Sequence, residues 1–180
     1  MNLPVPTSKL PELYGQPIQI RFLPRLRAHQ GRLLSGESRG SEVHAGSFLR
    51  KREIVLDSEL RTRRAEYARV VVHELFHFTW LRLGNTRRRS YEQLLAAEMR
   101  DTAAGELGWS AESRKLRLRV NDRRLRSWRW REYVCESFCD SAAWLFAGQA
   151  RNAEFTLPAR WRRGRRRWFQ DNGLMDRIPV

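Results

Sequence analysis

Residues 70–78 read VVVHELFHF, an apolar run that contains two histidines and one glutamate. The run lies in a longer helical pattern, from about residue 61 to about residue 83, that ends at a Gly84-Asn85 cap. Because apolar side chains occur on every side of the predicted helix, other elements must cover it. We therefore expect the chain to fold around this helix, with the helix central and buried.

The first 60 residues predict a small β-sheet beside that helix. Apolar and polar residues alternate at 17–24, which is typical of a half-buried strand. A Gly/Ser loop is expected at 33–42, and a hairpin or two short strands at 43–57. Three to four strands, in a mixed or antiparallel sheet, are expected.

The remaining chain predicts further helices. Ser90 and Gln93 form a capping box that would begin a helix running to about Glu106. Two more helices are expected at about 130–147 and 157–173, with an irregular segment at 111–130. The fold class is therefore α+β, with a small N-terminal mixed or antiparallel sheet packed on the central helix and more helices C-terminal to it.

At 180 residues, of which 41% are hydrophobic, the chain is expected to be one domain, 1–180. We place the core of this domain at about 15–150 and a basic helical extension at 151–180. No apolar stretch reaches the roughly 18 to 20 residues of a membrane span. The N-terminal residues MNLPVPTSKLPELYG lack the pattern of a secretory signal, which favours the cytoplasm. Cys135 and Cys139 are expected to be free, because an i, i+4 disulfide on a helix is geometrically awkward.

The formal net charge is +15, and residues 113–180 hold 17 basic and 7 acidic residues. Such a charge would attract nucleic acid weakly and without sequence specificity. The stretch RWRRGRRRWF at 160–169 could bind phosphates and stack on bases. We favour the alternative that its helix packs Trp161 and Trp168 on the core and exposes the arginines to solvent.

His73-Glu74-Leu75-Phe76-His77 is the pattern H-E-x-x-H. On a helix the two histidines lie one turn apart on one face and can bind one metal ion, whereas on a strand they would be about 13 Å apart. Burying two imidazoles and a carboxylate without a partner is costly, and a metal ion compensates for that cost. In zinc hydrolases with this pattern the ion lowers the pKa of a water and the glutamate, here Glu74, takes its proton.

A catalytic zinc ion needs a third protein ligand. The other two histidines, His29 and His44, both precede the motif, so the best candidate is an acid in YVCESFCDSAAWL at 133–145. Glu136 and Asp140 lie four residues apart on one face of the expected helix. Glu136 could bind the ion while Asp140 accepts the free N–H of a ligating histidine.

These residues resemble a known family. H-E-x-x-H followed by E-x-x-x-D-x-x-A, at Glu136, Asp140 and Ala143, is similar to the gluzincin branch of zincin metallopeptidases, including HtpX-type and ImmA/IrrE-like peptidases. The resemblance covers roughly residues 42–147. It implies a zincin-like fold and a Zn²⁺ site with Glu136 as third ligand and Asp140 bracing a histidine. Two differences are the long gap between the motifs and the lack of the transmembrane helices of the HtpX type.

Several assignments stay open. His73 and His77 with Cys135 and Cys139 would form a closed, structural zinc site. Tyr133 is a candidate to stabilise the oxyanion, with Tyr91 and arginine side chains as alternatives. Zincins bind substrate as an added strand at a sheet edge, and the segment 41–57 is the expected edge.

The sequence therefore predicts a zinc-dependent metalloendopeptidase that acts on a peptide or protein substrate. The alternative is a non-catalytic, metal-stabilised protein that binds nucleic acid through its basic surface. A protease recruited to DNA, as SprT-like enzymes are, would also fit the charge, although those enzymes use a third histidine that this chain lacks.

Overall fold

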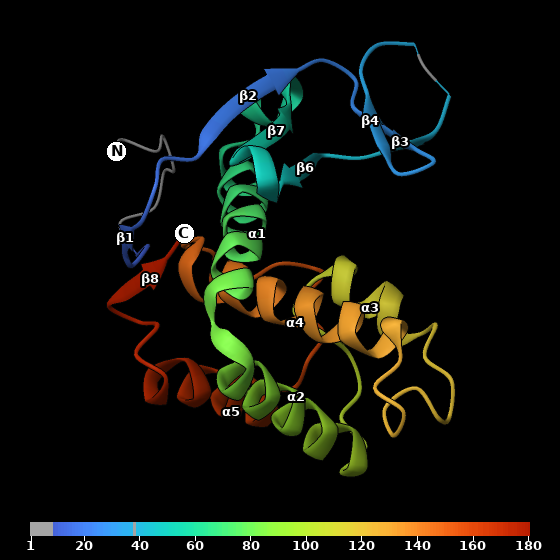
Figure 1. The fold of residues 1–180 in the computed structure, drawn as a ribbon, viewed down its shortest axis with the longest axis vertical. Coiled ribbons are helices and arrows are strands. Elements are labelled where there is room, and N and C mark those ends of the chain that lie inside the picture. The colour runs from blue at the N-terminus through green and yellow to red at the C-terminus, as the bar shows by residue number, and fades with distance from the viewer. Residues whose placement is uncertain (1–8, 38) are drawn as a thin grey trace.

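The computed structural model describes residues 9–37 and 39–180, and it has the expected α+β fold (Figure 1). The described strands are β1 (Glu12–Tyr14), β2 (Gln19–Leu23), β3 (Arg27–His29), β4 (Arg32–Leu34), β5 (Ser41–Glu42), β6 (Ala45–Phe48), β7 (Glu53–Asp57) and β8 (Arg177–Pro179). The α-helices are α1 (Arg64–Arg82), α2 (Gly84–Arg100), α3 (Trp109–Lys115), α4 (Trp128–Phe146) and α5 (Ala159–Asp171), with 3-10 helices η1 (Leu49–Lys51) and η2 (Ser58–Thr62). Residues 1–8, which form part of the N-terminal segment that argued against a secretory signal, lie outside the described residues, as does Ser38.

The sheet nearest the H-E-x-x-H motif has the strand order β2-β7-β6. β2 pairs with β7 in parallel, and β6 pairs with β7 antiparallel, so the sheet is mixed as expected. This arrangement confirms the strand predicted within 17–24 and the hairpin predicted within 43–57. β6 forms one edge of the sheet and lies against α1.

The rest of the N-terminal region differs from the sequence-based expectation. The segment 33–42 is not only a loop, because β4 and β5 lie at its ends and pair on either side of β3. β1 pairs in parallel with β8, so strands near the two ends of the described chain lie side by side. The strands are therefore shorter and more numerous than predicted.

α1 is central, as its apolar surface predicts. It runs from the β2-β7-β6 sheet toward α2 and packs along α4 (Figure 1). Side chains on all sides of its middle are fully buried, namely Val71, Val72, Leu75, Phe76 and Phe78. The helix is thus held in place from several directions, which fixes the positions of the polar groups that it carries.

The predicted start of the second helix is wrong. Gly84 has a φ of 68°, a left-handed conformation that suits glycine, and α2 begins at this residue directly after α1. Ser90 therefore lies inside α2, where its hydroxyl donates a hydrogen bond to the carbonyl of Arg87 instead of capping the helix. α2 also ends at Arg100 rather than near Glu106.

The C-terminal helices agree better with the expectation. α4 begins at Trp128, and Ser127 caps it by accepting a hydrogen bond from the Trp130 N–H at 3.3 Å. α3 occupies part of a stretch that we expected to be irregular. α5 packs Trp168 on the main core, while Trp161 is half-buried against a smaller cluster, which favours the core-packing interpretation of this helix. None of the helices in the described part of the chain combines the length and hydropathy that a membrane crossing requires.

Candidate metal centre

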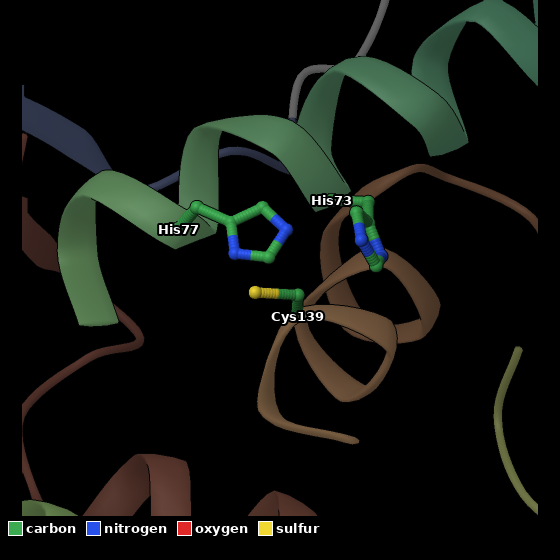
Figure 2. A group of neighbouring side chains, drawn as sticks. All are labelled: His73, His77 and Cys139. Carbon is green, nitrogen blue, oxygen red and sulfur yellow. The ribbon is translucent and has the colours of Figure 1, made fainter. Parts of the chain in front are cut away.

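His73 and His77 lie one turn apart on α1 and point to the same side of the helix (Figure 2). Their ring centroids are 5.1 Å apart. Both rings face α4, the helix that packs most extensively on α1. The helix thus brings the two imidazoles together as the spacing predicts.

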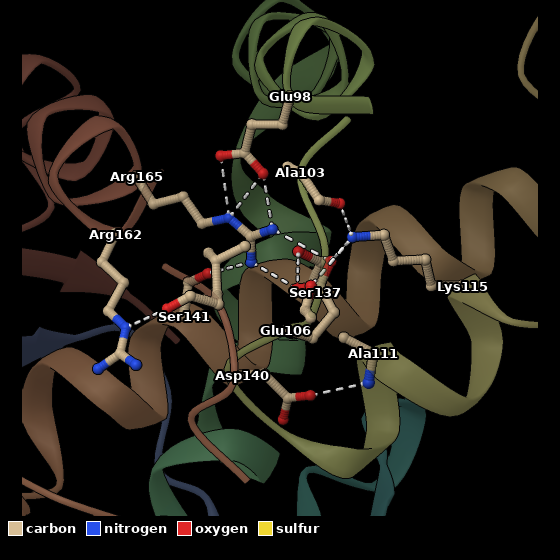
Figure 3. Close-up of polar contacts among 12 residues, drawn as sticks. Glu98, Ala103, Glu106, Ala111, Lys115, Ser137, Asp140, Ser141, Arg162 and Arg165 are labelled. Atoms are coloured by element: carbon tan, nitrogen blue, oxygen red, sulfur yellow. Dashed lines mark hydrogen bonds and ion pairs between the residues drawn. The ribbon is translucent and has the colours of Figure 1, made fainter. Parts of the chain in front are cut away.

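α4 supplies two carboxylates to His73. Asp140 Oδ1 lies 2.7 Å from His73 Nδ1, and Glu136 Oε2 lies 3.2 Å from His73 Nε2. The second oxygen of Asp140 accepts a hydrogen bond of 2.8 Å from the backbone N–H of Ala111 in α3 (Figure 3). Asp140 is therefore fixed from two sides, and it holds the orientation of the His73 ring.

The distance between His73 and Glu136 is compatible with two ligands of one metal ion. Two nitrogen or oxygen ligands of one tetrahedral zinc ion lie about 3.4 Å apart, because each is about 2.1 Å from the ion. The 3.2 Å between His73 Nε2 and Glu136 Oε2 is close to that spacing. Since Asp140 engages Nδ1, the other ring nitrogen of His73 is the one that faces Glu136.

Glu136 and His73 also interact electrostatically. Burial works to raise the pKa of the Glu136 carboxyl, but the hydrogen bond to His73 and the charges of His77, His73 and Arg114 lower that pKa to about 2. Burial works to lower the pKa of His73, yet the carboxylates of Asp140 and Glu136 raise it well above its usual value.

Cys139 is a further potential ligand. Potential ligand atoms of His73, His77 and Cys139 all lie within 4.8 Å of one another, so this group could hold a metal ion (Figure 2). Cys135 lies beside it, with Sγ 3.6 Å from His77 Nδ1. Both cysteines are free, as expected. The structure thus brings three of the four residues of the closed-site alternative into one possible metal-binding group, and Cys135 is not part of that group.

Glu74 points toward the sheet and is held by its edge strand. The Ser47 hydroxyl, on β6, lies 2.5 Å from Glu74 Oε2 and 3.1 Å from the Glu74 carbonyl oxygen. A hydroxyl has one proton, so it donates to one of these acceptors at a time, and the shorter contact is to the carboxylate. Glu74 is thereby positioned between β6 and the two histidines.

A cavity of about 410 Å³ opens beside these groups. It is lined by His73, Glu74, His77 and Glu136, together with residues of the segment 42–45 at the start of the edge strand β6. Neither cysteine lines it. The four motif residues therefore face a space that can admit another molecule, and the unpaired edge of the half-buried strand β6 adjoins that space.

The two tyrosines considered as oxyanion stabilisers, Tyr133 and Tyr91, do not reach this cavity. Tyr133 is buried, and its hydroxyl donates to Glu106 Oε1 at 2.6 Å. Tyr91 is also buried, with its hydroxyl 2.9 Å from Ser141 Oγ. Neither tyrosine lines the cavity, which corrects the expectation that Tyr133 faces the reacting groups. Two arginines do line it, Arg69 and Arg114, and a guanidinium nitrogen of Arg114 lies 3.3 Å from Glu136 Oε1.

Sequence reasoning missed three contributors to the site. Ser47 and Arg114 are ordinary surface residue types in segments with no motif, and only tertiary packing brings them to the site. Gly108 is the third, because a Cβ at this position would overlap the Asp140 carboxylate. Its place directly before α3 is the only local indication in the sequence that the backbone of this segment lies close to another side chain.

Comparisons with protein families, with curated proteins and with solved structures found no match to this chain. A functional conclusion therefore depends on the geometry of the chain's own residues.

Proposed function

We propose that this protein is a zinc-dependent metallopeptidase. The observation that carries the proposal is the position of His73, which has Asp140 at 2.7 Å from one ring nitrogen and Glu136 at 3.2 Å from the other. His77 lies one turn away, and Glu74 lines the same open cavity. This set has the residue types of a catalytic zinc site with three protein ligands. Among the described residues the group with ligand atoms within 4.8 Å of one another is His73, His77 and Cys139, so the proposal requires Glu136 and His77 to move closer together when the ion binds.

We assign His73, His77 and Glu136 as the residues that would hold the ion, with Asp140 fixing the His73 ring. A zinc ion bound there would act as a Lewis acid and make water a stronger acid and nucleophile at neutral pH. Glu74 would accept a proton from the attacking water and pass it to the leaving amine.

The edge strand β6 suits a peptide substrate. Its outer edge adjoins the cavity, so an extended peptide could pair with it through main-chain hydrogen bonds. Such pairing would place the scissile bond beside Glu74, because Ser47 on β6 already contacts that carboxylate. Arg114 replaces the tyrosines as the candidate oxyanion stabiliser, since its side chain lines the cavity.

Glu136 is preferred over Cys139 as third ligand for two reasons. Glu136 lines the cavity, whereas Cys139 is fully buried and does not. Glu136 Oε2 also lies 3.2 Å from His73 Nε2, close to the distance between two ligands of one zinc ion.

Two substitutions test the proposal. Glu74→Gln should retain zinc and lower hydrolysis of fluorescein-labelled casein by about 10² to 10⁴-fold, because the proton acceptor is lost. His73→Ala should lose both zinc and activity. Glu112→Gln, the same chemical change in α3 outside the cavity, should behave like the parent protein. If Glu74→Gln cleaved casein as fast as the parent, the assignment of Glu74 would be wrong.

A second candidate is a closed structural site in a non-catalytic, basic, nucleic-acid-binding protein. The grouping of Cys139 with His73 and His77 favours it. In that case Cys139→Ala would lose the metal and Glu136→Ala would keep it. No casein or peptide-library cleavage would then be found, and DNA binding would persist after chelation. In either case we propose that the protein works in a reducing compartment such as the cytoplasm, where its free thiols persist.

A further inference from the structure

A strongly basic surface lies apart from the cavity. Two adjoining hollows of about 260 and 320 Å³ are formed by α2, the chain between α3 and α4, and the start of α4. Six arginines line them, namely Arg88, Arg89, Arg123, Arg124, Arg126 and Arg131, and we call this surface the arginine face. The chain between α3 and α4 projects on the side of the molecule away from β1 and β8 (Figure 1).

Glu92 is the one acid that lines these two hollows, and its charge is already neutralised. Arg126 binds both of its oxygens, at 2.8 and 2.7 Å, and the Trp130 indole N–H donates to it at 2.6 Å. Arg89, Arg124 and Arg131 are exposed and form no ion pair with any described residue. The arginine face therefore carries positive charge that the described part of the chain does not balance.

The cavity at the metal centre has the opposite character. Its lining includes four glutamates, Glu42, Glu74, Glu136 and Glu154, and two arginines. It shares no lining residue with the two basic hollows. The arginine face is thus a separate surface, and a polyanion bound there would not be drawn into the cavity.

We propose that the arginine face binds the phosphate backbone of a nucleic acid. Guanidinium groups bind phosphate oxygens in pairs, and every basic residue lining the hollows is an arginine. Trp128, at the start of α4, is 60% exposed, with the Arg129 guanidinium 4.7 Å from its ring centroid. Such a ring can stack on an unpaired base, so a single strand should bind better than a duplex.

This assignment moves the expected contact away from α5, where the sequence concentrates its arginines. Trp161 and Trp168 of α5 pack on hydrophobic clusters and offer no exposed stacking surface comparable to Trp128. Concave hollows also suit a chain of phosphates better than the plane of a lipid bilayer. The sharpest test therefore compares nucleic-acid binding after charge reversal on the arginine face with binding after charge reversal on and before α5.

Binding should be measured by fluorescence anisotropy with a labelled single strand of about 20 nucleotides, at several salt concentrations. The test variant carries Arg89→Glu, Arg124→Glu and Arg131→Glu. The matched control carries Arg151→Glu, Arg163→Glu and Arg167→Glu, which change the net charge equally at exposed positions on and before α5. The test variant should bind at least about tenfold more weakly, and the slope of log K against log salt concentration should become shallower by about 2, because three phosphate contacts are lost. The control should stay within about threefold of the parent.

If both variants lost the same amount of affinity for the oligonucleotide, binding would depend on the net charge of the protein alone, and the proposal would be overturned. It would also fail if the parent bound anionic phosphatidylserine vesicles but no oligonucleotide, or bound neither at about 50 mM salt. Trp128→Ala should weaken binding of the single strand more than binding of a duplex of the same sequence. Circular dichroism should confirm that each variant is folded. His73→Ala should bind the oligonucleotide like the parent, which separates this surface from the proposed peptidase site.

Discussion

In the proposed peptidase, Ser47 would link the strand that binds the substrate to the residue that accepts the proton. It lies on the edge strand β6, and its hydroxyl is 2.5 Å from the carboxylate of Glu74 on α1. A hydrogen bond of this kind fixes the orientation of the Glu74 carboxylate, which in the proposed mechanism must face the water that gives up its proton. Nothing in the AGSF sequence of β6 indicates this contact, because only the packing of the strand on α1 creates it.

Ser47→Ala should therefore lower peptidase activity by about 10 to 100-fold without changing the zinc content, because Glu74 loses the group that orients it. Ser47→Thr keeps a hydroxyl and should restore most of the activity. Initial rates on a fluorogenic peptide, with zinc measured on the same samples, would test this. Full activity in Ser47→Ala would show that the hydrogen bond has no role in orienting Glu74.

The closeness of the residues proposed to bear the chemistry could largely be predicted from the sequence, and that of the residues that contact them could not. His73, Glu74 and His77 follow from one local pattern, since a helix brings positions i and i+4 together. Glu136 and Asp140 required a second pattern and the assumption that two helices pack together, which the structure supports with contacts to His73. Arg114 lay in a segment that we expected to be irregular, so its contact with Glu136 was not foreseen.

Among the elements, α1 and α4 were predicted well because their apolar patterns are long. The start of α2 was not, because a capping box at Ser90 matched the rule for a helix start while Gly84 allowed the chain to turn earlier. Local sequence rules thus failed where a single glycine made the turn between two helices. α3 was missed because it is short and rich in polar residues.

α3 contributes to the site through its backbone, and Gly108 allows α3 to approach α4. Gly108→Ala should force Asp140 away from its present position, because the added methyl group would overlap the Asp140 carboxylate. We expect zinc affinity to fall by about 10 to 100-fold, since Asp140 would no longer fix His73. Competition with a chelating dye would measure it. Gly164→Ala, where the added Cβ meets open space, is the matched control and should bind zinc like the parent.

At the scale of the whole molecule, a buried ionic network joins the C-terminal helix α5 to α2, α3 and α4. Arg165 of α5 is fully buried and binds Glu98 of α2 and Glu106, with shortest distances of 2.8 and 2.7 Å (Figure 3). Glu106 also contacts Lys115 of α3 and Tyr133 of α4. The sequence suggested that α5 exposes its arginines to solvent, and it held no indication that one of them, Arg165, would turn inward toward two distant glutamates.

This network should make stability depend on pH. Burial works to raise the pKa of Glu106, but Arg165, Lys115 and Tyr133 lower it below its usual 4.5. The unfolded chain therefore takes up a proton first as the pH falls. The contribution of Glu106 is present above about pH 4.5 and is lost as the pH falls through the lower, folded-state pKa.

Glu106→Gln should lower the free energy of unfolding at pH 7 by about 3 to 5 kcal/mol, because it leaves Arg165 with one carboxylate fewer. Its stability should also fall less steeply than that of the parent below about pH 4.5. Urea unfolding at a series of pH values would measure both effects. The control is Glu37→Gln, at an exposed surface ion pair, which should change stability by less than about 1 kcal/mol. A pH profile unchanged by Glu106→Gln would contradict the role assigned to the network.

The central claim is that one metal ion lies between α1 and the Glu136 carboxylate of α4. Elemental analysis of the purified parent, Glu136→Ala and Cys139→Ala proteins tests it most directly. The account predicts about one zinc per chain in the parent and in Cys139→Ala, and little or none in Glu136→Ala. A parent protein without zinc, or a Glu136→Ala protein that retains it while Cys139→Ala loses it, would contradict the account.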